Sequence, residues 1–211
     1  MRCILQIVCA SAFLSFVTTA LADQEGGLNH RLKGTYRVAG TESCAEAQLG
    51  FTDPPGLEAN SPAIALYNHV EGNISFDGAG SANFTGTLAT VIPVFPGYVP
   101  VEQPFASVGF TCDWTYAVAP DGSFKLQGSC IAQGLTGGIA GATDTISGYD
   151  VTGIIGLGRN VLMTSDTRPN EQTVVRSYQD VEVYSAKRIC ASALTFIRAN
   201  RLAPAGNDSD D

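Results

Sequence analysis

The sequence predicts an all-β protein, an antiparallel eight-stranded meander that closes into a barrel. Helical periodicity is nearly absent between residues 30 and 185, whereas short runs of β-branched and aromatic residues recur between Gly-rich turns. Even spacing with short links is typical of a meander that closes on itself. The expected strands cover residues 33–41, 65–76, 81–92, 107–119, 123–133, 143–155, 160–166 and 172–184.

The clearest element is a hairpin over residues 110–130, in which apolar and polar residues alternate on both sides of Pro120-Asp121-Gly122. Gly122 supplies the positive φ of a three-residue loop. A two-residue loop would set inward residues opposite outward ones, which the period of two forbids. The resulting register pairs Val118 with Phe124, Tyr116 with Leu126, Trp114 with Gly128 and Cys112 with Cys130. The last pair lies on one face, so we expect a disulfide between Cys112 and Cys130.

A second hairpin over residues 70–88 follows the same reasoning. Its turn at residues 77–80 pairs Phe76 with Ala82, Ile74 with Phe84, Gly72 with Gly86 and Val70 with Leu88. Inward glycines allow tight bending of a barrel wall, or leave room for a large side chain opposite. We therefore expect the ring of Trp114 to fill the space opposite Gly128.

The remaining segments are less regular. Prolines place residues 45–64 and 92–106 in long loops, and the second loop is either a connector packed on the rim or a flap or partner-binding strip. Residues 191–202 suit a short amphipathic helix, although Thr195-Phe196-Ile197 also fits a final strand. Residues 203–211 are small and acidic, and are expected to form a disordered tail.

The first 22 residues read as a signal peptide. Arg2 precedes an apolar run from Cys3 to Val17, and Ala20-Leu21-Ala22 supplies small residues before a cut at Asp23. The run is short for a membrane span and is interrupted by polar residues. Export to the bacterial periplasm or the extracellular space follows, with residues 23–202 as one barrel domain.

Four cysteines remain after that cut, which indicates two disulfides in an exported chain. Elimination leaves Cys44 and Cys190 as the second pair. In a simple meander, however, the end of the first strand and the end of the eighth lie at opposite rims, so this pair needs a tail that folds back or an early end of the first strand.

Composition and motifs exclude several functional classes. The net charge of −8 becomes −9 without Arg2, and Lys and Arg are sparse, which argues against nucleic acid and anionic lipid as partners. An outer-membrane barrel would need an apolar outside, whereas Thr111, Asp113 and Lys125 oppose the aromatic face. The identity of any protein partner stays open.

The sequence contains no nucleophile elbow, zinc-protease helix or phosphate-binding loop, so an enzyme is less favoured than a binding or structural protein. His30 and His69 have no other ligands at useful spacing, so we expect neither a metal nor a cofactor. Inward aromatic and aliphatic residues are the strongest remaining candidates, because an eight-stranded barrel is either filled by side chains or holds one small ligand. The candidate ligand-binding residues are Phe84, Leu88, Phe110, Trp114, Tyr116, Phe124 and Leu126.

With Gly34-Thr35-Tyr36 near the start and Lys187-Arg188 after the expected last strand, the chain resembles the calycin superfamily of lipocalin-like barrels. It is also similar to uncharacterised exported bacterial β-barrel proteins. The first resemblance implies that Tyr36 replaces a conserved tryptophan and that Arg188 packs over its ring. We therefore expect a secreted barrel that binds a small apolar ligand. The alternatives are a structural or adhesive surface module with a packed core, and a cyclase-like barrel enzyme.

Overall fold

The structure is a computed structural model that describes residues 27–52, 56–92, 105–165 and 170–199. The predicted signal peptide, the acidic tail and most of the proline-rich segment at 92–106 lie outside these residues. Within the described residues, no helix combines the length and the apolar character needed to cross a membrane. The fold is all-β and antiparallel, as the sequence predicts.

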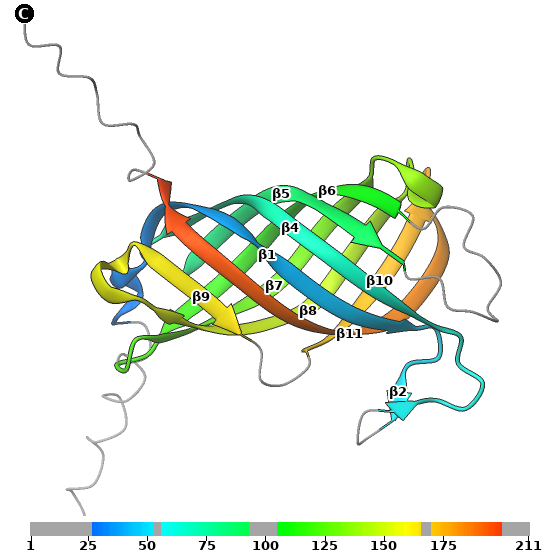
Figure 1. Cartoon of the computed structure of the whole chain (residues 1–211), viewed down its shortest axis with the longest axis horizontal. Coiled ribbons are helices and arrows are strands. Elements are labelled where there is room, and N and C mark those ends of the chain that lie inside the picture. The colour runs from blue at the N-terminus through cyan, green and yellow to red at the C-terminus, as the bar shows by residue number, and fades with distance from the viewer. Residues whose placement is uncertain (1–26, 53–55, 93–104, 166–169, 200–211) are drawn as a thin grey trace, which may run out of the picture.

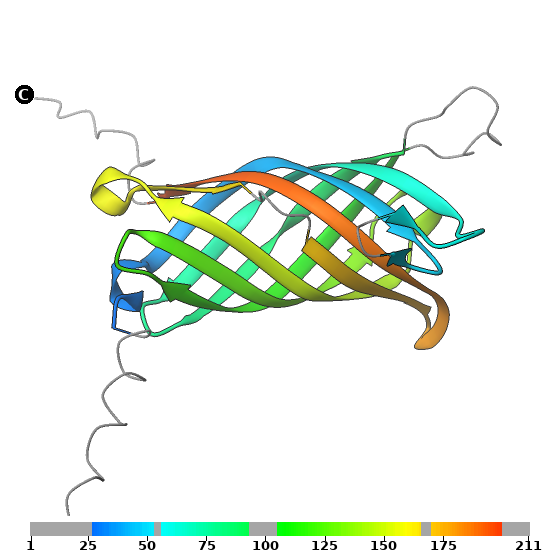
Figure 2. The same cartoon turned by 90° about the horizontal axis from the view of Figure 1, so that it is seen from below.

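The strands form a ring, because the first strand β1 (Lys33–Ala47) pairs with the last strand β11 (Val181–Arg198). Figure 1 shows the barrel lengthwise, and Figure 2 shows the same ring turned by 90°. The wall continues from β1 through β4 (Ala63–Asp77), β5 (Ser81–Val91), β6 (Phe105–Val118), β7 (Ser123–Gly134) and β8 (Thr143–Ile155). A small ribbon of β2 (Phe51–Thr52) and β3 (Gly56–Leu57) projects from the connection between β1 and β4.

One position in the ring is shared by two short strands, β9 (Val161–Ser165) and β10 (Asn170–Tyr178). Both pair antiparallel with β8 and with β11, so they run in the same direction. The prediction that residues 160–166 and 172–184 are successive antiparallel strands is therefore wrong. The hairpin turn lies further along, at Gln179 and Asp180, whose φ angles of 49° and 64° give the type I′ geometry that suits strand twist.

The C-terminal segment is a strand and not the amphipathic helix favoured for residues 191–202. Strand β11 runs to Arg198 and pairs with β1 over its length, and with β10 and then β9 on its other side. Two open sheet edges flank this segment, and the ladder of backbone hydrogen bonds they offer outweighs its weak helical pattern. Cys190, Ser192, Leu194 and Phe196 consequently face the interior.

Both predicted hairpins have the expected register. In β6 and β7, Val118 pairs with Phe124, Tyr116 with Leu126, Trp114 with Gly128 and Cys112 with Cys130. In β4 and β5, Phe76 pairs with Ala82 and Val70 with Leu88. A Cβ atom added at Gly128 would lie 2.6 Å from Cδ1 of Trp114, so the indole does occupy the space that a side chain there would need.

Two disulfides each join a pair of neighbouring strands in the barrel wall. Cys112 is bonded to Cys130 with a Cα–Cα distance of 3.9 Å, and Cys44 is bonded to Cys190 with a Cα–Cα distance of 4.2 Å. The expected conflict over Cys44 and Cys190 disappears for two reasons. Strand β1 extends to Ala47, and the eighth strand position belongs to β11, in which Cys190 lies directly opposite Cys44.

Candidate functional site

The half of the barrel beside the 3-10 helix η1 (Asn29–Arg31) is filled by apolar side chains. Tyr36, Phe76 and Tyr116 form two successive edge-to-face contacts, with ring centroids 5.6 Å and 5.1 Å apart. We call this region the closed half. Its core members with at most 5 % exposure include Leu32, Tyr36, Ile74, Phe76, Tyr116, Val118, Phe124, Leu162 and Phe196.

Hydrogen bonds to η1 close the end of this half. The backbone N–H of Val118 donates to Asn29 Oδ1 at 3.0 Å, and the hydroxyl of Tyr116 donates to the carbonyl oxygen of Leu32 at 2.8 Å. The hydroxyl of Tyr36 donates to the carbonyl oxygen of Arg159 in η3 (Leu157–Arg159) at 2.9 Å. The hydroxyl groups of Tyr36 and Tyr116 therefore both have hydrogen-bond partners.

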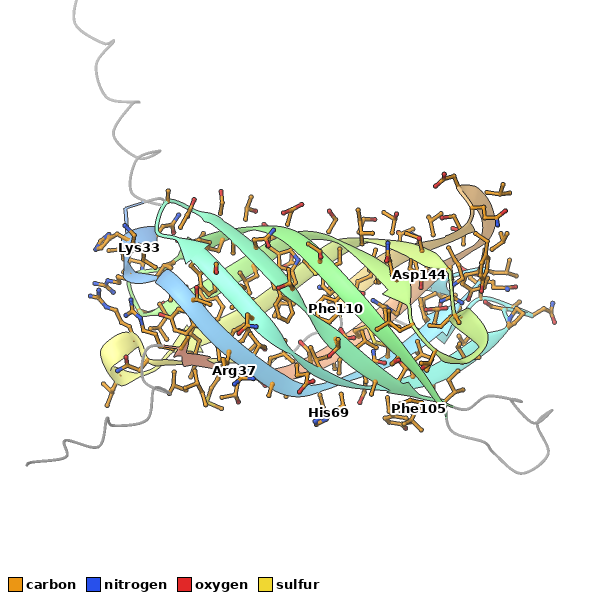
Figure 3. All side chains as sticks on the ribbon, turned by 90° about the horizontal axis from the view of Figure 1, so that it is seen from above. Lys33, Arg37, His69, Phe105, Phe110 and Asp144 are labelled. Atoms are coloured by element: carbon orange, nitrogen blue, oxygen red, sulfur yellow. A yellow bond between two sulfur atoms is a disulfide. The ribbon has the colours of Figure 1, made fainter. Side chains whose placement is uncertain are left out.

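The opposite half of the interior is lined by polar side chains. We call it the polar half, and Figure 3 shows Phe105 and Asp144 at that end of the barrel, with Lys33 at the other. Most of these residues occupy the inward positions of their strands, so the barrel presents polar groups where a core is expected. The buried polar residues assigned to this half are Glu42, Glu46, Asn68, Thr90, Asn170, Gln172, Arg188 and Ser192, each at most 9 % exposed.

One chain of hydrogen bonds joins three strands of the polar half. Thr90 Oγ1 donates to Asn68 Oδ1 at 2.8 Å, and Asn68 Nδ2 donates to Glu42 Oε2 at 2.8 Å. Both polar atoms of the Asn68 amide are thus satisfied. The arrangement holds the carboxylate of Glu42 in a fixed position at the inner wall of β1.

Arg188 lies on β11, the neighbour of β1 in the ring, as the register partner of Glu46. Its Nε and Nη2 donate to Oε1 of Gln172 at 3.0 Å and 2.6 Å, and Nη2 also reaches the Tyr149 hydroxyl at 3.4 Å. Burial lowers the pKa of Arg188, but Tyr149, Glu42 and Glu46 raise it by more, so its pKa stays above the ordinary value. The guanidinium is therefore charged in the folded protein, and the two buried carboxylates are its electrostatic counterparts.

The rim of the polar half has its own ion pair. Arg176 binds Asp144 through two parallel bonds of 2.7 Å, and its guanidinium carbon lies 5.6 Å from the ring centroid of Tyr184. The Tyr184 hydroxyl donates to Oε1 of Glu46 at 2.9 Å. Burial and the nearby carboxylate of Glu46 both raise the pKa of Tyr184.

A cavity of about 50 Å³ lies in the interior and is lined by residues of both kinds. Phe84, Phe110 and Trp114 form an apolar wall, while Glu42, Tyr149 and Ser192 contribute polar atoms. Burial raises the pKa of Tyr149 to about 12, with a smaller effect of Glu42 in the same direction and an opposing effect of Arg188. Its hydroxyl is therefore neutral at physiological pH.

Two buried nitrogen atoms have no hydrogen-bond partner among the described residues, Trp114 Nε1 and Asn170 Nδ2. Trp114 is 7 % exposed and lines the cavity. Nearly all buried donors in folded proteins are paired with protein or with ordered water, so each exception requires an explanation.

The seven residues predicted to bind a ligand fall into two groups. Phe84, Leu88, Phe110 and Trp114 line the cavity. Tyr116, Phe124 and Leu126 pack deeper in the closed half and do not contribute to its lining. The sequence reasoning missed the buried polar residues of the interior, although the inward parity of Asn68 and Thr90 follows from the second hairpin.

The role given to Arg188 by the calycin resemblance belongs to another residue. Arg198 lies over the ring of Tyr36, with 5.9 Å between its guanidinium carbon and the ring centroid, and Arg198 is the register partner of Tyr36. Arg188 is ten positions earlier on the same strand and has the same inward parity. Without the correct last strand, parity alone does not distinguish the two arginines.

Potential metal ligands come together at one place in the described residues. Glu42, Cys44 and Cys190 have ligand atoms within 4.8 Å of one another. The two sulfur atoms are already bonded to each other, so the cluster offers a single carboxylate. His30 lies at η1 and His69 lies on the outer wall of β4, so the histidines do not join this cluster.

The outer wall carries a broad, shallow depression of about 710 Å³ near the turn between β4 and β5. Several of its polar side chains already have hydrogen-bond partners, as in the 2.7 Å contact from Asn83 Nδ2 to Asp113 Oδ1. The interior cavity is the stronger candidate site, because it brings the unpaired donor of Trp114 together with a buried carboxylate, that of Glu42. No family model, no curated protein and no solved structure matches the chain.

Proposed function

We propose that the protein is an exported β-barrel that serves as a structural or adhesive surface module with a packed core, and that it carries no apolar ligand. The observation that carries this proposal is the size of the interior cavity. Ligand sites for ordinary small molecules occupy roughly 300–1,000 Å³. The cavity of about 50 Å³ is several times smaller.

Ring packing supports the same conclusion. The side chains of Phe84, Phe110 and Trp114 contact one another, with centroid distances of 4.9 Å between the two phenylalanines and 5.3 Å between Phe84 and Trp114. These rings occupy the space that a lipocalin-like barrel would leave for its ligand. Two disulfides suit an oxidising compartment and a rigid wall.

Fluorescence of Trp114, the single tryptophan of the chain, tests the proposal directly. We expect no saturable change in emission when fatty acids or retinol are added to the wild-type protein. The matched control is Phe84→Ala, which removes one ring from the cavity wall and creates room for a small apolar probe such as benzene. Saturable, micromolar binding of a fatty acid or retinol by the wild-type barrel would overturn the proposal.

A second measurement detects a ligand that is already bound after purification. A ligand that binds only the folded state raises the melting temperature, and removing it lowers that temperature. We expect the same Tm before and after the protein is unfolded, extracted with organic solvent and refolded with its disulfides intact. A lower Tm that a solvent extract restores would favour the carrier alternative.

A further inference from the structure

Trp114 lines the interior cavity and carries a buried donor that needs an acceptor. The indole Nε1 of Trp114 has no partner among the described residues, and the side chain is 93 % shielded from solvent, since its exposure is 7 %. Leaving such a group unpaired costs free energy, because the N–H loses its hydrogen bond to water without replacing it. A bound oxygen atom in the cavity that Trp114 lines would remove this cost.

The same cavity contains an acceptor that suits a donating ligand. Glu42 lines it, and the amide of Asn68 bonds only to Oε2 of that carboxylate in the contact that holds it. An anionic ligand would be repelled by the carboxylate. An ammonium ion has no lone pair with which to accept from the indole N–H. A neutral hydroxyl group satisfies both requirements, because it accepts one hydrogen bond and donates another.

The volume limits the size of this ligand. One water molecule needs about 10–15 Å³ of cavity measured in this way. The observed volume of about 50 Å³ therefore accommodates a few water molecules or one molecule with a few non-hydrogen atoms. The aromatic wall formed by Phe84 and Phe110 accommodates a short alkyl group as well as it accommodates water.

We propose that this cavity is a binding site for a small neutral hydroxyl compound, ordered water or a short-chain alcohol, which accepts a hydrogen bond from Trp114 Nε1 and donates one to Glu42. The site links the apolar wall of β6 to the polar wall of β1. It is separate from the structural role proposed above, since that role requires only that no large apolar ligand enters the barrel.

The single tryptophan makes the site directly observable by nuclear magnetic resonance. The ¹⁵N-labelled full-length protein has one indole N–H signal. For bound water we expect a cross-peak from this proton to the water resonance, with the sign of a water molecule that stays bound for longer than nanoseconds. Tyr149→Phe and Ser192→Ala are the controls, because they remove the hydroxyls that line the cavity and that would relay exchange, and the cross-peak should persist in both.

A titration distinguishes the two sources of the hydroxyl. If the site takes short alcohols, methanol or ethanol shifts the indole signal saturably, whereas the bulkier tert-butanol does not. Glu42→Gln keeps the size of the side chain. We expect it to change the chemical shift of the indole N–H signal, while the cross-peak to water remains. An indole proton with no water cross-peak and no saturable alcohol shift would overturn the proposal, as would bonding of Nε1 to a protein acceptor in a crystal structure.

Discussion

The closed half and the polar half of this barrel share one set of strands but are held together differently. In the closed half, rings such as Phe76 and Phe196 pack with at most 3 % exposure. In the polar half, the interior consists of hydrogen-bonded pairs such as Arg188 with Gln172, and the Cys44–Cys190 disulfide joins the two strands that close the ring. A continuous barrel wall therefore does not require a continuous hydrophobic core, provided that covalent and polar links replace it.

The largest expected effect comes from the disulfide of the polar half. Cys44→Ala combined with Cys190→Ala should lower the free energy of unfolding by about 5 kcal/mol, because the bond closes a loop with a sequence separation of 146 residues. The control, Cys112→Ala with Cys130→Ala, opens a loop of separation 18 and should cost about 3 kcal/mol. Urea unfolding of both variants measures the difference. An equal or larger loss in the control would show that the polar half does not depend on its covalent link.

A slightly smaller effect is expected from a ring in the closed half. Phe196→Ala should destabilise the protein by about 4 kcal/mol, since it deletes a fully buried side chain and leaves a cavity beside Phe124. Leu66→Ala in the polar half serves as the comparison and should cost about 2 kcal/mol. Leu66 packs beside the Cys44–Cys190 disulfide and outside the main core cluster. Thermal unfolding of the two variants decides whether packing is concentrated in the closed half, and similar losses would refute that division.

The smallest expected effect is on the pH dependence of stability, through Tyr149. Its pKa is about 12 in the folded protein and about 10 in the unfolded chain, so the folded state retains this proton between those values. Stability should therefore fall as pH rises from 10 to 12, by up to about 2 kcal/mol from this residue. Tyr149→Phe should reduce that slope, whereas the exposed Tyr67→Phe should not. Urea midpoints at pH 9 and pH 11.5 provide the measurement, and equal slopes in wild type and Tyr149→Phe would contradict the prediction.

The closed half was the more predictable region, for a physical reason. Alternation of large apolar residues with polar ones fixes both the inward face and the register, and Pro120-Asp121-Gly122 fixes the loop. The pairs Trp114–Gly128 and Cys112–Cys130 follow from that local pattern alone. The hairpin from β4 to β5 was predictable on the same grounds.

The polar half could not be predicted from the apolar pattern, because polar residues occupy inward positions of its strands. Residues 41–47 place Glu42, Cys44 and Glu46 at the inward positions of β1, so the strand lacks the apolar alternation that would have extended it beyond residue 41. The pairing of Cys44 with Cys190 also needed the identity of the last strand. That identity depends on contacts between residues far apart in the sequence, and no local pattern specifies them.

The candidate site contains residues that the sequence pattern predicts and residues that it does not. Phe84, Phe110 and Trp114 could be assigned to the interior from parity. That Glu42 and Tyr149 face them across a cavity depends on the closure of the ring by β11 and on the register shift in β8 between the partners of Gly128 and Ser129. Such a shift moves every later side chain relative to its neighbours. The extra residue is Gly148, whose φ is 86°, and an isolated glycine within a strand is the sequence signal for a bulge that the sequence prediction did not use.

Pairing of Tyr36 with Arg198 brings the first and last barrel strands together at the closed half, so the described chain enters and leaves the barrel at the same end. Any fusion partner, anchor or cell-envelope attachment joined at either terminus is consequently tethered at that end. The polar half, with Arg176 and Asp144 at its rim, then points away from the tethered end. A circular permutant that joins the two ends and opens the chain at the β2–β3 ribbon would preserve every barrel strand while reversing that orientation.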